Sequence, residues 1–113
     1  MSEMKDISAA MNKANINITM VRVLTSLSET RSFTKTAERL CLSQSAISHA
    51  MKALEEIVGA PLVIRDRRGV AFTATGEAAL DAARAALHAL GRLAGLREHS
   101  IKGRVRLALV SSA

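Results

Sequence analysis

The chain has 113 residues, a formal net charge of +6 and no Trp or Tyr, so it allows one small domain with an appended element and an aliphatic core. Its basic balance favours an anionic partner such as nucleic acid or an acidic protein surface, although a solvated basic protein could have the same composition. The single Cys41 excludes an internal disulfide and a multi-cysteine zinc site, and it fits a reducing compartment.

The first 16 residues are polar and show no firm periodicity, so 1–16 are predicted to form a flexible N-terminal tail. The segment MSEMKDISAAMNK also lacks the apolar core of a signal peptide, and we expect a cytoplasmic protein. From Asn17 the pattern becomes helical, with Asn17 as the cap and an end near residue 29. The inward face of this helix is predicted to consist of Ile18, Val21, Leu24, Thr25 and Leu27.

Two further helices are predicted before residue 59. A short one begins at Ser32 or Thr34 and ends before a buried turn that holds Cys41, which we interpret as a packed, inert thiol. Ser43 caps the next helix, which ends where Gly59 can adopt a positive φ. The residues of the short helix expected to face inward are Phe33, Ala37 and Leu40.

On a helical wheel, the helix at 44–58 has two distinct faces. The apolar face is predicted to contain Ile47, Ala50, Met51, Leu54 and Val58. The opposite face carries Ser45, Ser48, His49 and Lys52. Small hydrogen-bonding side chains near the start are typical of a recognition helix, whose N-terminal half enters the major groove of DNA. No second metal ligand stands three or four residues from His49, so we expect no metal and no cofactor.

A β-hairpin and a long helix follow. Two β-rich runs, 62–65 and 70–73, flank the turn Asp66-Arg67-Arg68-Gly69. Thr73 can then cap an Ala-rich helix over 74–98, which charged residues interrupt too often for a membrane span. Apolar residues on this helix recur at three- and four-residue steps, a seam that predicts dimerisation through Leu80, Ala83, Leu87, Leu90 and Ala94. The run 104–110 predicts a strand without a partner.

Three helices followed by a hairpin is the order of a winged helix-turn-helix, here a mainly α fold occupying 17–73 and followed by a linker helix. Two functions fit this fold. One is sequence-specific DNA binding by a dimeric transcriptional regulator. The other is a protein–protein interaction module in which the third helix and the wing engage an acidic partner. An enzyme is not expected, because no acid, base and nucleophile converge.

The block SFTKTAERLCLSQSAISHAMKALEEIVGAPLVIRDRRGVAFTATGEAAL closely resembles the N-terminal DNA-binding domain of LysR-type transcriptional regulators. The resemblance runs over about 17–90, and its densest motifs are SFTxxAERL, LSQSAIS and R-x-x-R-G ending in T-x-x-G. It implies a bacterial regulator that binds double-stranded promoter DNA as a homodimer through the linker helix, with a higher oligomer left open for a full-length protein. It also implies that 99–113 is the start of a truncated effector-binding domain.

By this resemblance, three groups of residues contact DNA. Residues of the third helix face base edges or nearby phosphates, the start of the second helix contacts the backbone, and the wing reaches toward the minor groove. An arginine-rich turn can also be simply solvated, but beside a reading helix it is more often a phosphate contact. The predicted DNA-binding set is Ser32, Thr34, Lys35, Ser43, Gln44, Ser45, Ser48, His49, Lys52, Arg65, Arg67 and Arg68.

Overall fold

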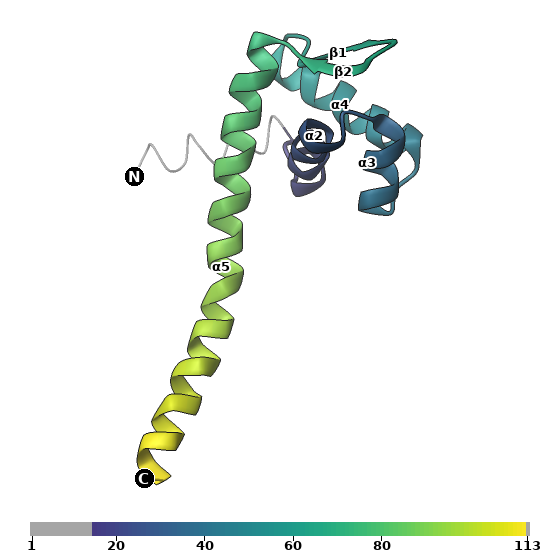
Figure 1. The fold of residues 1–113 in the computed structure, drawn as a ribbon. Helices are drawn as coiled ribbons and strands as arrows, with labels where there is room; N and C mark the ends of the chain where they lie inside the picture. The colour runs from purple at the N-terminus through teal and green to yellow at the C-terminus, as the bar shows by residue number, and fades with distance from the viewer. Residues whose placement is uncertain (1–14, 113) are drawn as a thin grey trace, which may run out of the picture.

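The computed structural model describes residues 15–112, with side-chain environments for residues 15–96. Within these residues four α-helices and one hairpin follow in the order α2 (Ile18–Thr30), α3 (Phe33–Leu40), α4 (Gln44–Val58), β1 (Val63–Asp66), β2 (Gly69–Phe72) and α5 (Ala74–Ser112). In Figure 1 the shorter helices and the hairpin form a head, from which α5 extends as a long arm. The predicted winged helix-turn-helix followed by a long helix is confirmed.

Side-chain caps fix where the helices begin. The side chains of Asn17, Ser32 and Ser43 accept hydrogen bonds of 3.0, 3.1 and 3.1 Å from the backbone amides three residues further on. The Thr73 hydroxyl accepts one of 2.9 Å at the start of α5. Each such cap contributes about 0.5–2 kcal/mol. The predicted caps are confirmed, as is the end of α4 at Gly59, whose φ is +84°.

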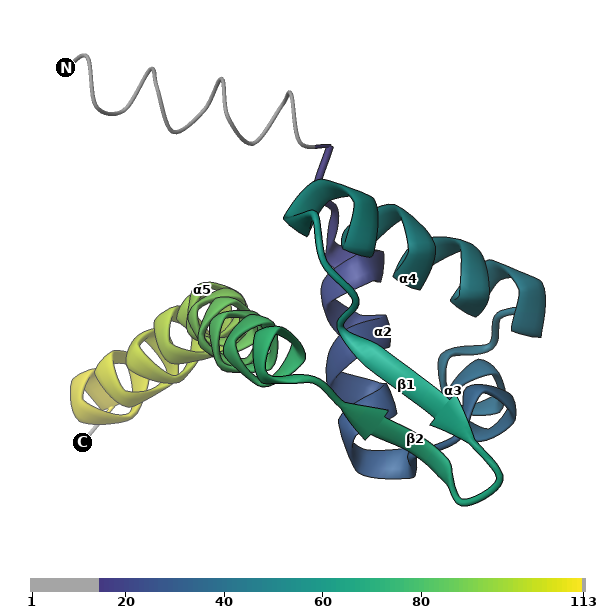
Figure 2. The same ribbon diagram turned by 90° about the horizontal axis from the view of Figure 1, so that it is seen from above.

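The helix α2 lies at the centre of the head. It contacts α3, α4 and α5, and Figure 2 shows it between α5 on one side and α3 and α4 on the other. Because three helices cover it, its buried face is broader than the predicted one. Leu24 and Leu27 are buried as predicted, and Val21 packs against the core. Ile18 was expected to face inward but is 52% exposed. The buried side chains of α2 are Met20, Val23, Leu24, Ser26 and Leu27.

Two further predictions about packing are wrong. Cys41 is exposed, because it occupies the left-handed cap of α3 with a φ of +56°, and its side chain lies outside the core. Val58 is predicted on the apolar face of α4, but it is 43% exposed at the last residue of the helix, next to the Gly59 cap. The rest of that apolar face is buried as predicted, with Ile47 at 0% and Met51 at 2% exposure.

The hairpin forms the wing. Its strands pair antiparallel with Val63 opposite Phe72 and Arg65 opposite Val70, and Arg67 and Arg68 form the turn. The first strand begins and ends one residue later than predicted, and the second begins and ends one residue earlier. Leu62, just before β1, is fully buried, and Val70, near the turn, is 7% exposed. Val63 and Phe72 also pack against the core, so the wing is attached to it along its length.

The helix α5 runs to Ser112, so the predicted helix end near residue 98 and the predicted strand at 104–110 are wrong. A strand needs a neighbouring strand for its backbone groups, whereas a helix satisfies them internally. The start of an effector-binding domain at 99–113 remains a prediction. The predicted flexible tail at 1–16 falls almost entirely outside the described residues. No helix in the described part of the chain is long and apolar enough to cross a membrane.

Candidate nucleic-acid interface

The exposed face of α4 carries the predicted reading residues. Gln44, Ser45, His49 and Lys52 are exposed, and Ser48 is half-buried. These side chains alternate with the core face of the same helix, so the wheel prediction holds for this part of α4. No acidic side chain interrupts the exposed face from Gln44 to Lys52. The face therefore offers neutral donors and acceptors followed by one cation.

Two surface hollows border the wing, one mainly toward the junction of α2 and α3 and one toward α4. The first is lined by Thr34 at the start of α3, by Gln44 and by Arg65. The second is lined by Ser48, Lys52 and Arg65. Because Arg65 borders both hollows, the wing runs alongside the exposed face of α4. The structure thus brings together predicted contacts from α3, α4 and β1 that are up to 31 positions apart in the chain.

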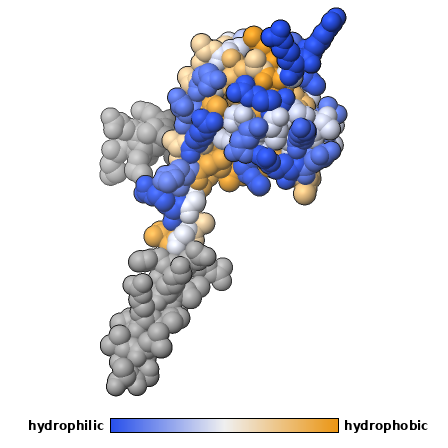
Figure 3. Space-filling view, in the orientation of Figure 1, coloured by the Kyte–Doolittle hydropathy of each residue, from blue (hydrophilic) through white to orange (hydrophobic). Residues whose placement is uncertain are grey.

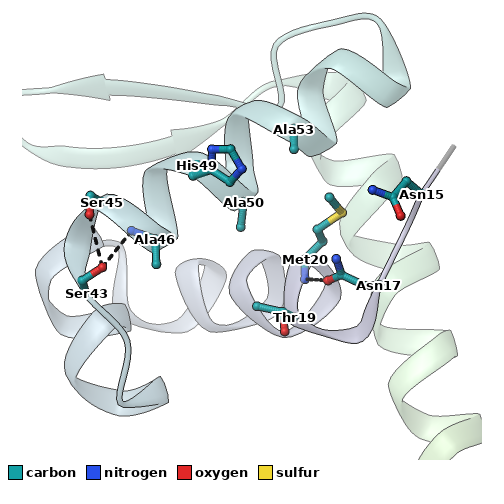
Figure 4. A pocket seen from close by; sticks show the side chains of 10 residues that line it. All are labelled: Asn15, Asn17, Thr19, Met20, Ser43, Ser45, Ala46, His49, Ala50 and Ala53. Atoms are coloured by element: carbon teal, nitrogen blue, oxygen red, sulfur yellow. Dashed lines mark hydrogen bonds between the residues drawn. The ribbon is translucent and has the colours of Figure 1, made fainter.

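A third hollow lies on the other side of α4, where the helix faces the start of α2. Figure 4 shows Ser45 and His49 from α4 opposite Asn17 and Thr19. Its volume is about 680 Å³. From the sequence, Asn17 is predicted only as a helix cap, and no pattern indicates that the start of α2 adds polar side chains beside the reading helix. That proximity depends on how α2 and α4 pack, which no local pattern contains.

The two predicted serine contacts at the helix starts have structural roles. The Ser32 hydroxyl accepts from the Lys35 amide. The Ser43 hydroxyl accepts from the Ala46 amide and lies 3.2 Å from the Ser45 hydroxyl. Their side chains are therefore engaged in capping. Lys35 itself is exposed in the first turn of α3.

The three wing arginines occupy different environments. The guanidinium carbon of Arg65 lies 4.0 Å from the ring centroid of Phe33, so this side chain rests on α3. Arg67 and Arg68 are exposed in the turn, where the Arg68 amide donates a 2.8 Å hydrogen bond to Asp66 Oδ1. Figure 3 shows a strongly hydrophilic protrusion at the upper right, where Figure 1 draws the hairpin turn. Only two of the three arginines are thus at the tip.

Glu55 is a structural residue that the sequence analysis missed. Its carboxylate accepts hydrogen bonds from the backbone amides of Leu62, at 2.7 Å, and Val63, at 3.4 Å. The far end of α4 therefore anchors the chain where it enters the wing. An acidic residue near the end of a helix gives no local signal of such a role, because its partner amides are seven and eight residues away.

The predicted dimer seam divides into two parts. Leu80 and Ala83 are 2% and 6% exposed in the core of the same chain, so these two residues of the seam are already covered within the chain. Leu87 is half-buried, whereas Ala94 is exposed and Leu90 is 42% exposed. Within the described part of α5, the large apolar side chains that are exposed also include Leu93, at 64%, and Leu96, at 61%.

Metal chemistry finds no support in the described part of the chain. No three His, Cys, Asp or Glu side chains there are grouped so that they could hold a metal ion. His49 lines the hollow beside α2, whose other lining residues are neutral or apolar. The interface therefore consists of hydrogen-bonding groups and cations.

Comparisons with known proteins agree with this arrangement. A family described as bacterial regulatory helix-turn-helix protein, lysR family, matches residues 18–77. The Hca operon transcriptional activator HcaR of Escherichia coli (strain K12) is 42% identical over 67 residues, which are 59% of this chain and 23% of that protein. The regulator YvbU of Bacillus subtilis (strain 168) is 43% identical over 63 residues, 55% of this chain and 22% of that protein.

Among solved structures, the CbnR_DBD-DNA complex is similar with a TM-score of 0.68 and 33% identity, covering 75% of this chain and 97% of that one. The chain spans less than a quarter of the length of the two curated relatives.

Proposed function

Because the chain belongs to the lysR family of bacterial regulatory helix-turn-helix proteins, we propose that it binds double-stranded promoter DNA as a transcriptional regulator in the bacterial cytoplasm. The family match covers α2, α3, α4, the wing and the first turn of α5, which are the elements that build the interface. The observation that carries the proposal is the exposed polar face of α4, flanked by hollows on both sides.

In this proposal, the first turns of α4 enter the major groove. Gln44 can form two hydrogen bonds with an adenine, and Ser48 is short enough to reach a base or a phosphate. His49 follows Ser48 directly and stands one turn after Ser45, where it can donate or accept. Ile47 and Met51 hold the opposite face in the core and so fix which side of α4 is presented to DNA.

Phosphate contacts then position the domain on the duplex. Thr34 and Lys35 stand in the first turn of α3, where backbone amides add to the attraction for an anion. Arg67 and Arg68 extend from the tip of the wing, and Lys52 continues the face of α4. Such contacts supply affinity with little sequence preference.

We further propose that the regulator is a homodimer held by α5. The partner surface differs from the predicted seam, since Leu80 and Ala83 are already used in the core. Among the α5 side chains that the structure describes, Leu90, Leu93 and Leu96 are the large apolar ones that remain exposed, and they recur at three-residue steps along the helix. Hydrophobic colour is visible on α5 just above the grey part in Figure 3. An apolar stripe of this kind is typically covered by a second helix.

The test compares a duplex that the wild-type protein selects from a randomised pool with a scrambled duplex of the same composition. Gln44→Ala is expected to lose about 1–3 kcal/mol of discrimination at one base pair while retaining affinity for the scrambled duplex. Glu56→Ala, exposed at the far end of the same helix, is the matched control and should leave the preference unchanged. Full discrimination in a folded Gln44→Ala protein would remove Gln44 from the base-reading residues.

A further inference from the structure

Both aromatic rings of the chain lie against arginine side chains. Phe33 and Phe72 are the two aromatic residues in the sequence. The Arg65 guanidinium lies over Phe33 at 4.0 Å, and that of Arg31 lies over Phe72 at 5.2 Å, both measured to the ring centroid. These distances fall within the range of about 6 Å for cation–π contacts.

The two contacts cross between the helices and the wing. Arg31 and Phe33 flank the Ser32 cap at the junction of α2 and α3, whereas Arg65 is in β1 and Phe72 ends β2. In one pair the arginine comes from the helical part and the ring from the wing. In the other pair the roles are exchanged. Each strand of the wing is therefore tied to the same junction by one arginine–phenylalanine pair.

Backbone contacts bring β2 to the same place. The Arg31 guanidinium donates a 3.3 Å hydrogen bond to the Val70 carbonyl. The carbonyl oxygen of Arg31 lies so close to Gly69 that a Cβ there would be 2.8 Å away, and Gly69 has a φ of +118°. Arg31 itself has a φ of +56°, the left-handed conformation that ends α2. Arg31 thus contacts β2 at its first residue, at Val70 and at its last residue, Phe72.

The junction of α2 and α3 lies where it can hold the short hairpin near the reading residues. A two-stranded hairpin is marginal by itself, and its strands here have four residues each. Arg31, Phe33, Arg65 and Val70 line the same hollow as Gln44, which stands in the first turn of α4. Whatever holds the wing at this junction therefore sets the distance between the wing and the reading residues.

We propose that Arg31 and Arg65 are positioning residues whose crossed contacts with Phe72 and Phe33 hold the wing at a fixed place beside α4. The clamp, meaning these four residues, lets the cations at the wing tip contact phosphates while the first turn of α4 reads bases. This inference rests on the proposed function for its consequence in DNA binding, but the holding of the wing is a property of the free protein.

The first experiment uses the protein without DNA. Amide hydrogen exchange is followed by NMR in the wild type, in Arg31→Gln and in Phe72→Leu. Phe72→Leu removes the ring without changing any charge. Both variants are expected to exchange wing amides about two- to fivefold faster, with α2 and α4 unchanged. Arg84→Gln, an exposed arginine on α5, is the control for loss of one charge. Unchanged wing exchange in both variants would overturn the clamp.

The second experiment is a double-mutant cycle in DNA binding. Affinity for a scrambled duplex is measured for Arg31→Gln, for the wing-tip double variant Arg67→Ala with Arg68→Ala, and for their combination. A positioning residue acts through the wing tip, so Arg31→Gln should cost about two- to fivefold alone and much less when the tip is already neutral. Equal costs in both backgrounds would mean that Arg31 contacts phosphate directly, and would overturn the positioning role.

Phe72→Leu supplies the matching arm of the cycle. It should weaken binding by a similar factor and lose that effect in the wing-tip variant. Arg31→Gln remains informative if the Phe72 variant unfolds, because Arg31 is exposed. A failure of the proposed function would appear differently, as wild-type protein that shows no salt-dependent binding to any duplex. The exchange experiment would then still decide whether the clamp holds the wing.

Discussion

Replacing Gly76 with Ala tests the place where α5 crosses the segment that leads into the wing. Gly76 is buried in the first turn of α5. A Cβ at this position would lie 1.9 Å from the Leu62 carbonyl oxygen and 2.8 Å from its carbonyl carbon. Real Cβ contacts essentially never fall below 3.0 Å, so the helix and the segment would have to separate by more than 1 Å.

Hydrogen bonds at both the carbonyl and the amide of Leu62 oppose this separation. The Leu62 carbonyl accepts a 3.0 Å hydrogen bond from the Thr73 amide, and the Leu62 amide is held by the Glu55 carboxylate. Overpacking against such a fixed neighbour typically costs about 1–3 kcal/mol, and a strained or broken hydrogen bond adds about 1 kcal/mol. The better helix propensity of Ala offsets about 1 kcal/mol of this loss in the free energy of unfolding. We expect a net loss of about 1–3 kcal/mol, a large part of the stability of a small domain.

The assay is urea unfolding followed by circular dichroism, with Gly91→Ala as the control. Gly91 is also in α5, but nothing lies within 4 Å of the Cβ that Ala would add. Gly91→Ala should therefore be neutral or raise the free energy of unfolding by up to about 1 kcal/mol. If Gly76→Ala were as stable as the wild type, the close approach of α5 to Leu62 would not constrain the fold.

Two further predictions concern the base of the wing and the dimer. Glu55→Gln should lower the free energy of unfolding by about 1 kcal/mol in the same urea assay, because a neutral amide oxygen accepts more weakly from the Leu62 and Val63 amides; an equal loss in Glu56→Gln would point to charge alone. Leu93→Glu should shift the protein to monomer in analytical ultracentrifugation, and an unchanged dimer would exclude this part of α5 from the interface.

The parts of the fold that depend on neighbouring residues were predictable. A cap and the amide it accepts from are three residues apart, so Ser32, Ser43 and Thr73 could be recognised from spacing alone. The same holds for the end of α4 at Gly59 and for the turn between the strands. Local hydrogen bonding decides these features, and the rest of the molecule does not alter them.

Faces that depend on tertiary packing were predicted less well. The wheel of α4 succeeded for Ile47, Met51 and Leu54 and missed only at Val58, the last residue of the helix. It was incomplete for α2, which three helices enclose: Leu24 and Leu27 are buried as predicted, but Ile18 is exposed. Val23, outside the predicted face, is fully buried. Cys41 was placed in a buried turn because its neighbours are apolar, yet the left-handed backbone there leaves it exposed. Periodicity alone does not report how many sides of a helix are covered.

The wing shows why the arrangement of the interface exceeds what a sequence pattern contains. Arg31 and Phe72 are 41 positions apart, and Phe33 and Arg65 are 32 apart, so no helical or strand period relates them. In the sequence, the three arginines in and beside the turn form a single basic cluster. In the structure, Arg65 packs on the Phe33 ring, whereas Arg67 and Arg68 lie at the tip of the wing. If the clamp holds as proposed, affinity and base preference are coupled through it, because the same contacts place the wing-tip cations and border Gln44. A change at Arg31 would then alter DNA recognition through a residue that need not contact DNA.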